Sequence, residues 1–180
     1  HNDARRQRQM CIRDRHIPVQ APQEFIDRYM GVYDQGWEAL RQQRHKRAMT
    51  LGLVPQDTPM IPMTTTEAWQ GLDTDTKRYQ AKRMAVYAAM VEAMDFHIGR
   101  LIQHLKDTDQ YDNTVFIFAS DNGSEGSGPS LESTPANNLM LSLLDYTNDY
   151  GTLGLKGSYS TIGPNFASAA ASPLAFYKFY

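Results

Sequence analysis

The chain has 180 residues, of which 41% are hydrophobic and 21% are charged, and its formal net charge is −2. This length permits one domain with a sizeable core, and the near-neutral charge argues against a nucleic-acid partner, which usually requires a basic excess. No apolar run is long enough to be a transmembrane segment, and the single Cys11 cannot form an internal disulfide. The chain starts without methionine at His1 and stops abruptly at Tyr180, so we expect an interior fragment.

Residues 1–15 are basic and lack an apolar period. Such a segment is either an arm for an anionic partner or a disordered tail. Its end, Met10 to Arg15, also resembles a translated sequencing adapter. We therefore expect residues 1–15 to be disordered or artefactual.

Residues 16–22, which read His-Ile-Pro-Val-Gln-Ala-Pro, are predicted to form an extended loop because two prolines interrupt any helix. His16 opens this loop. An imidazole can transfer a proton near neutral pH, although most loop histidines are ordinary surface residues. The residue type alone does not distinguish a proton-transferring histidine from an ordinary surface residue.

Two long helices, with a short one between them, are predicted before residue 110. The first runs from Gln35 to Leu51, with Asp34 as the N-cap and Gly52 as a left-handed stop. A proline-containing linker follows, and then a capping-box pattern over residues 64–67 opens a short helix. The second and longest helix starts at residues 74–76. Its apolar residues recur at helical spacing and predict that it packs on a sheet; they are Met84, Ala88, Val91, Met94, Ile98, Leu101 or Ile102, and Leu105.

The most informative stretch is residues 112–126. Residues 114–119 form an apolar run without alternation, which predicts a strand buried on both faces of a mainly parallel sheet. Asp121 and Asn122 follow directly, at the carboxyl edge where α/β sheets bind ligands. Their oxygen atoms suit a hard cation such as Ca²⁺. An ordinary Asp-Asn-Gly turn is the alternative.

The chain after residue 126 is rich in Ser, Gly, Pro and Asn, which predicts long loops. Residues 139–146 are an apolar island that suits one or two helical turns. The final segment contains Gly163-Pro164 and ends with Tyr177-Lys178. By residue type alone, Lys178 is an unremarkable surface lysine.

Three stretches together resemble the sulfatase family of the alkaline-phosphatase-like superfamily. The sequence motif formed by residues 112–115 and 120–123 resembles the calcium-binding segment of that family, and residues 16–22 resemble its H-x-P-x-x-A-P loop. Residues 163–178 look like its G-P-x-W-A-x-A…P-x-x-x-Y-K stretch. The resemblance covers about residues 16–178, and it implies that residues 16–180 are a partial catalytic domain. It implies an α/β fold, a fragment of an alkaline-phosphatase-like sandwich with a central, mainly parallel sheet flanked by helices.

The resemblance also implies an activity. It suggests hydrolysis of a small-molecule sulfate ester with calcium and a formylglycine nucleophile. Asp121 and Asn122 would bind the metal, and His16 and Lys178 would bind the substrate and assist the reaction. The family forms formylglycine from a cysteine in C-x-P-x-R, but Cys11 is followed by Arg13 where proline belongs. We therefore expect the nucleophile and further acidic metal ligands to lie outside this chain.

Two alternatives stay open at this point. A phosphonate monoester or phosphodiester hydrolase of the same superfamily would share the Asp121-Asn122 element. A truncated, non-catalytic α/β fragment would share the whole pattern without activity. The specific sulfate ester, the compartment and the oligomeric state are not determined by the sequence.

Overall fold

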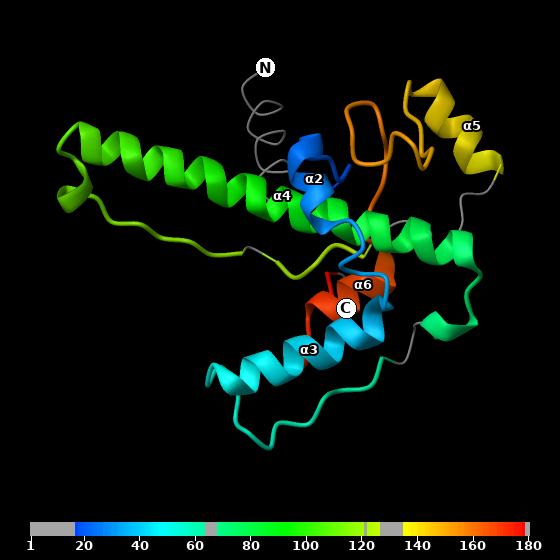
Figure 1. Ribbon diagram of the computed structural model, residues 1–180, viewed down its shortest axis with the longest axis horizontal. Helices are drawn as coiled ribbons and strands as arrows, with labels where there is room; N and C mark the ends of the chain where they lie inside the picture. Colours follow the sequence, from blue (N-terminus) through cyan, green and yellow to red (C-terminus); the bar gives the residue numbers. More distant parts are fainter. Residues whose placement is uncertain (1–16, 64–67, 121, 127–134, 179–180) are drawn as a thin grey trace.

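The computed structural model describes residues 17–63, 68–120, 122–126 and 135–178. In these ranges the elements, in chain order, are α2 (Gln23–Tyr29), α3 (Gly36–Thr50), the 3-10 helix η1 (Trp69–Gly71), α4 (Thr74–Asp107), the 3-10 helix η2 (Tyr111–Asn113), α5 (Pro135–Leu143) and α6 (Gly163–Ala170). The long helix α4 is the axis of the molecule, and α2, α3 and α6 gather around its middle and first half (Figure 1).

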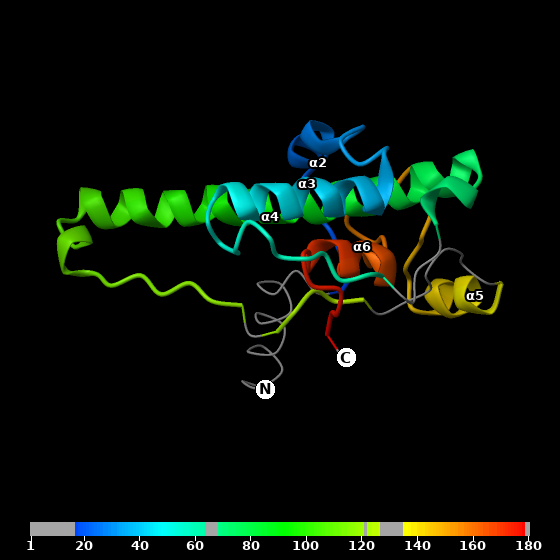
Figure 2. The same ribbon diagram turned by 90° about the horizontal axis from the view of Figure 1, so that it is seen from below.

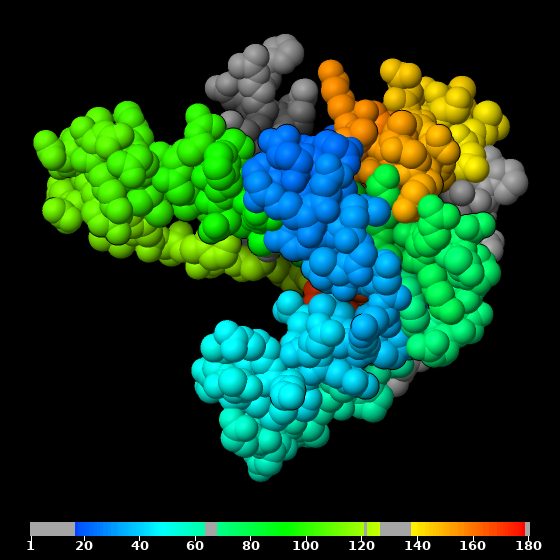
Figure 3. Space-filling model, viewed as in Figure 1, coloured from blue at the N-terminus to red at the C-terminus, as the bar shows by residue number. Residues whose placement is uncertain are grey.

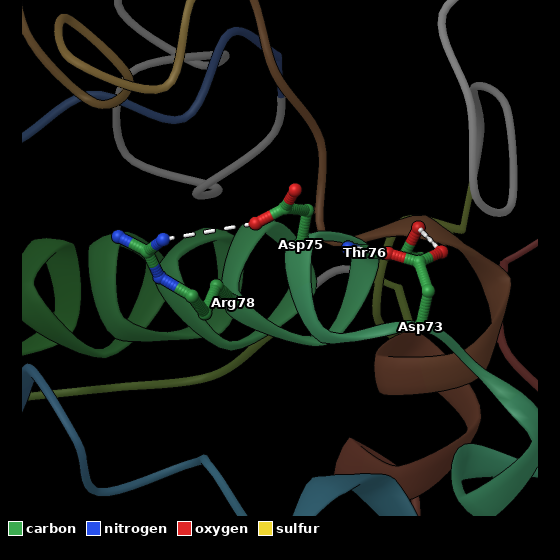
Figure 4. A network of polar contacts seen from close by, with 4 residues as sticks. All are labelled: Asp73, Asp75, Thr76 and Arg78. Atoms are coloured by element: carbon green, nitrogen blue, oxygen red, sulfur yellow. Dashed lines mark hydrogen bonds and ion pairs between the residues drawn. The ribbon is translucent and has the colours of Figure 1, made fainter.

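The start of α4 is fixed by a side-chain cap. Asp73 accepts hydrogen bonds from the backbone N–H of Thr76 at 2.9 Å and from its hydroxyl at 2.6 Å. These bonds favour the ionised carboxylate and hold the pKa of Asp73 below its ordinary value. An exposed pair between Asp75 and Arg78 at 3.7 Å lies on the next turn (Figure 4). The predicted start of this helix is confirmed.

An aromatic cluster joins α3, η1, α4 and α6. Trp37 is fully buried, and its ring meets the ring of Trp69 edge to face with centroids 4.8 Å apart. Phe166 of α6 meets Trp37 in the same manner at 5.5 Å. Met84 supplies the contact from α4. Edge-to-face packing suits the aromatic quadrupole, so these rings fix how α3 and α6 meet.

A second apolar cluster lies on another face of α4. Phe25 and Ile26 of α2 pack there with Val86, and Val19 joins them from the preceding loop. Backbone bonds tie that loop to residues 154–160: the N–H of Val19 donates to the carbonyl of Ser160 at 2.9 Å. The first half of α4 is therefore buried on two sides, and in Figure 2 α2 lies above α4 and α6 lies below it.

Arg83 connects α4 to the beginning of α6. Its Nη2 donates to the hydroxyl of Thr161 at 2.7 Å, its Nε to the carbonyl of the same residue, and its Nη1 to Gln80 at 2.9 Å. Burial lowers the pKa of Arg83 to about 10. Gly163 has φ +69°, and a Cβ there would fall 2.9 Å from the guanidinium. This close approach leaves room for glycine only.

The helix predicted over residues 35–51 is confirmed as α3. Its N-cap is Gln35, without a side-chain hydrogen bond, so the expected capping role of Asp34 is wrong. Gly52 does adopt the left-handed conformation, with φ +69°, and its N–H donates to the carbonyl of Met49. The capping box expected over residues 64–67 lies outside the described residues. No helix in the described part of the chain combines the length and apolar composition needed to cross a bilayer.

The expected burial of residues 114–119 is not observed. The segment is extended, but Val115 is 86% exposed and Ile117 is 90% exposed. In the described ranges no β-strand is formed, and one isolated bridge joins Thr147 and Ser158. The physical reason is that an extended segment is buried only when neighbouring strands satisfy its backbone groups and helices cover its faces. No such neighbours lie beside it among the described residues.

The second half of α4 shares this exposure. The predicted apolar stripe is buried at Met84 and Ala88, whereas Leu101 near the other end is 53% exposed. In the space-filling view, the end of α4 and the segment that follows it project from the body, away from α3 (Figure 3). The helix exists as predicted, but the sheet on which it was expected to pack is absent from the described residues.

Candidate functional site

The loop of residues 122–126 packs against the final described segment. The N–H of Lys178 donates to the carbonyl of Ser124 at 2.9 Å. A Cβ on Gly126 would fall 2.3 Å from the ring of Tyr177, and a Cβ on Gly123 would lie 3.6 Å from the Lys178 nitrogen. The two segments therefore approach closely, and the loop needs its glycine at position 126 for this contact.

The segment that carries Lys178 is held to the helices around it. The hydroxyl of Ser168 on α6 donates to the carbonyl of Ala175 at 2.5 Å. The N–H of Ile61, in the loop after α3, donates to the carbonyl of Pro173 at 3.1 Å. Since Arg83 ties α6 to α4, the position of Lys178 depends on the long helix through a continuous series of contacts.

Opposite charges meet where the loop and the final segment touch. The Nζ of Lys178 lies 3.5 Å from Oε2 of Glu125. The Glu125 side chain is 4% exposed and the Lys178 side chain is 25% exposed. A carboxylate this deeply buried is costly unless it has a cationic partner, so the two charges belong together.

A cavity of about 240 Å³ lies beside this ion pair. The described residues that line it are Tyr87 of α4, Ser120, residues 122–125, and Ala170 and Ala171 at the end of α6. Asn122 and Glu125 are thus on the cavity wall, and Lys178 lies next to the cavity because it pairs with Glu125. Two residues predicted from distant parts of the sequence are brought to one place.

The other two predicted site residues, Asp121 and His16, lie outside the described residues. The loop after His16 is described: Val19 packs in the second apolar cluster, and Tyr87 contacts that cluster and also lines the cavity. The roles of His16 and Asp121 stay predictions.

Glu125 was not identified from the sequence, although it is the most buried charged group at the site. Its position in a polar Gly-Ser-Glu-Gly loop suggests an exposed turn, and no local pattern indicates burial. The negative charge of Glu125 also acts on the Tyr159 hydroxyl. Burial raises the pKa of Tyr159, with Tyr146 and then Glu125 adding to the shift.

The donor atoms at the cavity are chemically suited to a hard cation. Asn122 offers an amide oxygen on the wall, and oxygen atoms are what Ca²⁺ prefers. Within the described ranges, no three His, Cys, Asp or Glu side chains gather closely enough to hold a metal ion. The complete ligand set therefore stays a prediction.

Comparison with known proteins agrees with this reading of the chain. The sequence profile of the sulfatase family matches residues 9–159, a range that ends before Lys178. An uncharacterized sulfatase of Schizosaccharomyces pombe is 40% identical over 160 residues, which are 88% of this chain and 28% of that protein. An arylsulfatase of Klebsiella aerogenes is 38% identical over 163 residues, which are 90% of this chain and 34% of that protein.

The chain spans about a third of the length of these relatives. A shorter match, 44% identical over 43 residues, is to an uncharacterized sulfatase of Escherichia coli. The family profile covers most of the chain, including the loop of residues 122–126 that lines the cavity. The chain belongs to the sulfatase family.

Proposed function

We propose that this chain is part of the catalytic domain of an enzyme that hydrolyses small-molecule sulfate esters. The observation that supports this most is the meeting of Asn122 and the Glu125–Lys178 pair at one cavity. Asn122 offers an oxygen ligand for a cation and Lys178 supplies an ammonium, and both positive charges would attract the oxygens of a sulfate group. The arylsulfatase relative supports the same class of reaction.

Each residue has a proposed part in the reaction. Lys178 places positive charge where the sulfate oxygens bind, and charge fixed in a partly buried site stabilises an anionic transition state better than solvent does. His16 transfers a proton to the departing alcohol oxygen, for which an imidazole is suited near neutral pH. Neither side chain replaces a covalent nucleophile.

Two further groups complete the proposal. Asn122 and Asp121 are proposed ligands of a Ca²⁺ ion, which would supply positive charge to the sulfate oxygens. Two side chains provide only part of the roughly 6–8 oxygen atoms that calcium takes. The formylglycine nucleophile of the family is proposed to come from sequence outside these 180 residues.

The fold proposal extends the family assignment. We propose that residues 114–119 are a strand of the central, mainly parallel sheet of an alkaline-phosphatase-like fold. The support is their extended backbone, their continuous apolar sequence and their position directly before the Asn122 loop. Hydrogen exchange on the full-length protein tests this. Slow exchange over residues 114–119 is expected, and fast exchange there would contradict it.

The function is tested with the full-length gene product and a chromogenic aryl sulfate. We expect release of sulfate, a loss of activity on removing calcium with a chelator, and a large loss in Asn122→Ala and Lys178→Ala. Thr58→Ala, a substitution in the loop after α3 at a half-buried residue that does not line the cavity, is the control and should keep full activity. Hydrolysis of an aryl phosphonate ester without hydrolysis of the sulfate would transfer the assignment to a phosphoryl hydrolase.

The isolated 180-residue chain provides a second test. It lacks a matching formylglycine motif, so we expect weak calcium binding by calorimetry and no hydrolysis of aryl sulfates. Sulfate release by this chain that disappears in Cys11→Ser would show that Cys11 is the nucleophile, contrary to the proposal.

A further inference from the structure

Among the described residues that line the cavity, Glu125 is the charged one, and it has no part in the proposed reaction. It is 4% exposed and its Oε2 faces the Nζ of Lys178. A glutamate in a loop of small polar residues would normally point into solvent, where its charge is hydrated at no cost. Its burial beside the proposed sulfate-binding lysine calls for a physical explanation.

The separation of the two charges is informative. A tight charge-assisted hydrogen bond between nitrogen and oxygen is about 2.7–2.9 Å long, whereas Lys178 and Glu125 are 3.5 Å apart. An ammonium has three N–H donors, so a loose pair with one carboxylate is compatible with a second contact to an oxyanion. The carboxylate can therefore hold the ammonium without competing strongly with a bound sulfate.

The backbone makes this arrangement rigid. The carbonyl of Ser124, next to Glu125, accepts the N–H of Lys178 at 2.9 Å. The ring of Tyr177 lies against Gly126 on the other side. The two charged residues thus start from backbone positions that are fixed relative to each other. A lysine has four rotatable side-chain bonds, and a second anchor at its tip removes most of that freedom.

We propose that Glu125 is a positioning residue: its buried carboxylate holds the Lys178 ammonium at the edge of the cavity, ready to receive a sulfate oxygen. This rests on the proposed function of Lys178. The carboxylate does not touch the substrate; it acts through the lysine. A displacement of a catalytic group by about 1 Å can cost about 100-fold in rate, so this restraint has a measurable value.

The main test is a double-mutant cycle on the full-length enzyme, with kcat and KM for an aryl sulfate measured separately. We expect Glu125→Gln to lower kcat/KM by about 10- to 100-fold, and Glu125→Asp, which keeps the charge, to recover part of the loss. In the Lys178→Met background, Glu125→Gln should change kcat/KM no further. Equal losses in both backgrounds would mean a merely structural role and would overturn the proposal.

A second readout does not depend on sulfatase activity. Labelling of Lys178 with an amine-reactive reagent, followed by peptide mass spectrometry, reports how exposed its tip is. The Lys178 side chain is 25% exposed in the wild type, and its labelling should rise several-fold in Glu125→Gln because its tip is no longer held. Unchanged labelling would refute the pairing even in an active enzyme, whereas increased labelling in an enzyme without sulfatase activity would refute only the proposed function.

The matched control is Glu92→Gln. Glu92 of α4 forms an ion pair with Arg28 of α2 and lines no part of the cavity. This substitution removes the same charge from another ion pair of the same chain. It should leave both kcat/KM and Lys178 labelling at the wild-type level. An equal rise of labelling in this variant would show that the effect is not specific to Glu125 and would count against the proposal.

Discussion

Replacing Gly126 by alanine tests whether the site depends on close packing between the loop and the final segment. An ideal Cβ at this position falls 2.3 Å from Cε2 and 2.4 Å from Cδ2 of Tyr177. Nonbonded carbon atoms prefer about 3.5–4.0 Å. The ring or the loop must therefore move by roughly 1 Å or more, and either movement displaces the neighbouring Lys178.

The expected magnitude follows from that overlap. Overpacking of a well-packed region costs about 1–3 kcal/mol, and a shift of about 1 Å in a catalytic group costs up to about 100-fold in rate. We expect Gly126→Ala to lower the free energy of unfolding by about 1–3 kcal/mol. We also expect it to lower kcat/KM for an aryl sulfate more than tenfold. Urea unfolding and steady-state kinetics of the full-length protein measure the two effects.

The matched control is Gly151→Ala, because a Cβ there meets nothing within 4 Å and the residue has no positive φ. In a Tyr177→Ala background the ring is gone, so adding Gly126→Ala should cost little more. If Gly126→Ala behaved like Gly151→Ala in both assays, the close contact with Tyr177 would not exist in the protein. The position of Lys178 would then not depend on packing between the loop and the final segment.

Three further predictions concern the scaffold. Trp37→Ala should lower the free energy of unfolding by about 3–5 kcal/mol, because Trp37 is fully buried in the aromatic cluster; an unchanged urea midpoint would contradict that packing. Asp73→Asn should lower the melting temperature at pH 7. Because the folded pKa of Asp73 lies below 3.8, its contribution is present above pH 3.8 and is lost as the pH falls through the folded value. Thermal scans across this range test it, and a difference that persists at lower pH would refute the cap. Gly99→Ala, at an exposed position of α4 with nothing within 4 Å of its Cβ, should raise stability by about 0.5–1 kcal/mol; a lower urea midpoint would show that α4 is contacted there.

The local elements were predictable because their signals are local. The apolar spacing predicted α4, and Gly52 marked the end of α3 through a conformation that glycine adopts readily. The start of the long helix was expected at residues 74–76, and Asp73 was not identified as its N-cap. Asp34 was assigned a cap that it does not form, because Gln35 is already helical in its backbone angles.

The long-range features were predictable only in part. An apolar run such as residues 114–119 indicates that its burial is favourable, but it does not indicate which elements cover it. Neither the burial of Glu125 nor the contact of Tyr177 with Gly126 has a local sequence signal, since both arise where segments distant in sequence meet. That Asn122 and Lys178 lie in one region was expected from the family resemblance and not from periodicity.

The exposed segment from Val115 to Phe118 has a consequence for handling the 180-residue chain. Four consecutive apolar residues, all highly β-prone, present backbone donors and acceptors with no strand beside them among the residues that the structure describes. An open edge of this kind is a template for pairing between molecules. The isolated chain should therefore self-associate through this segment as its concentration rises. Ile117→Lys should suppress the association in sedimentation experiments, since a charge on an edge discourages such pairing.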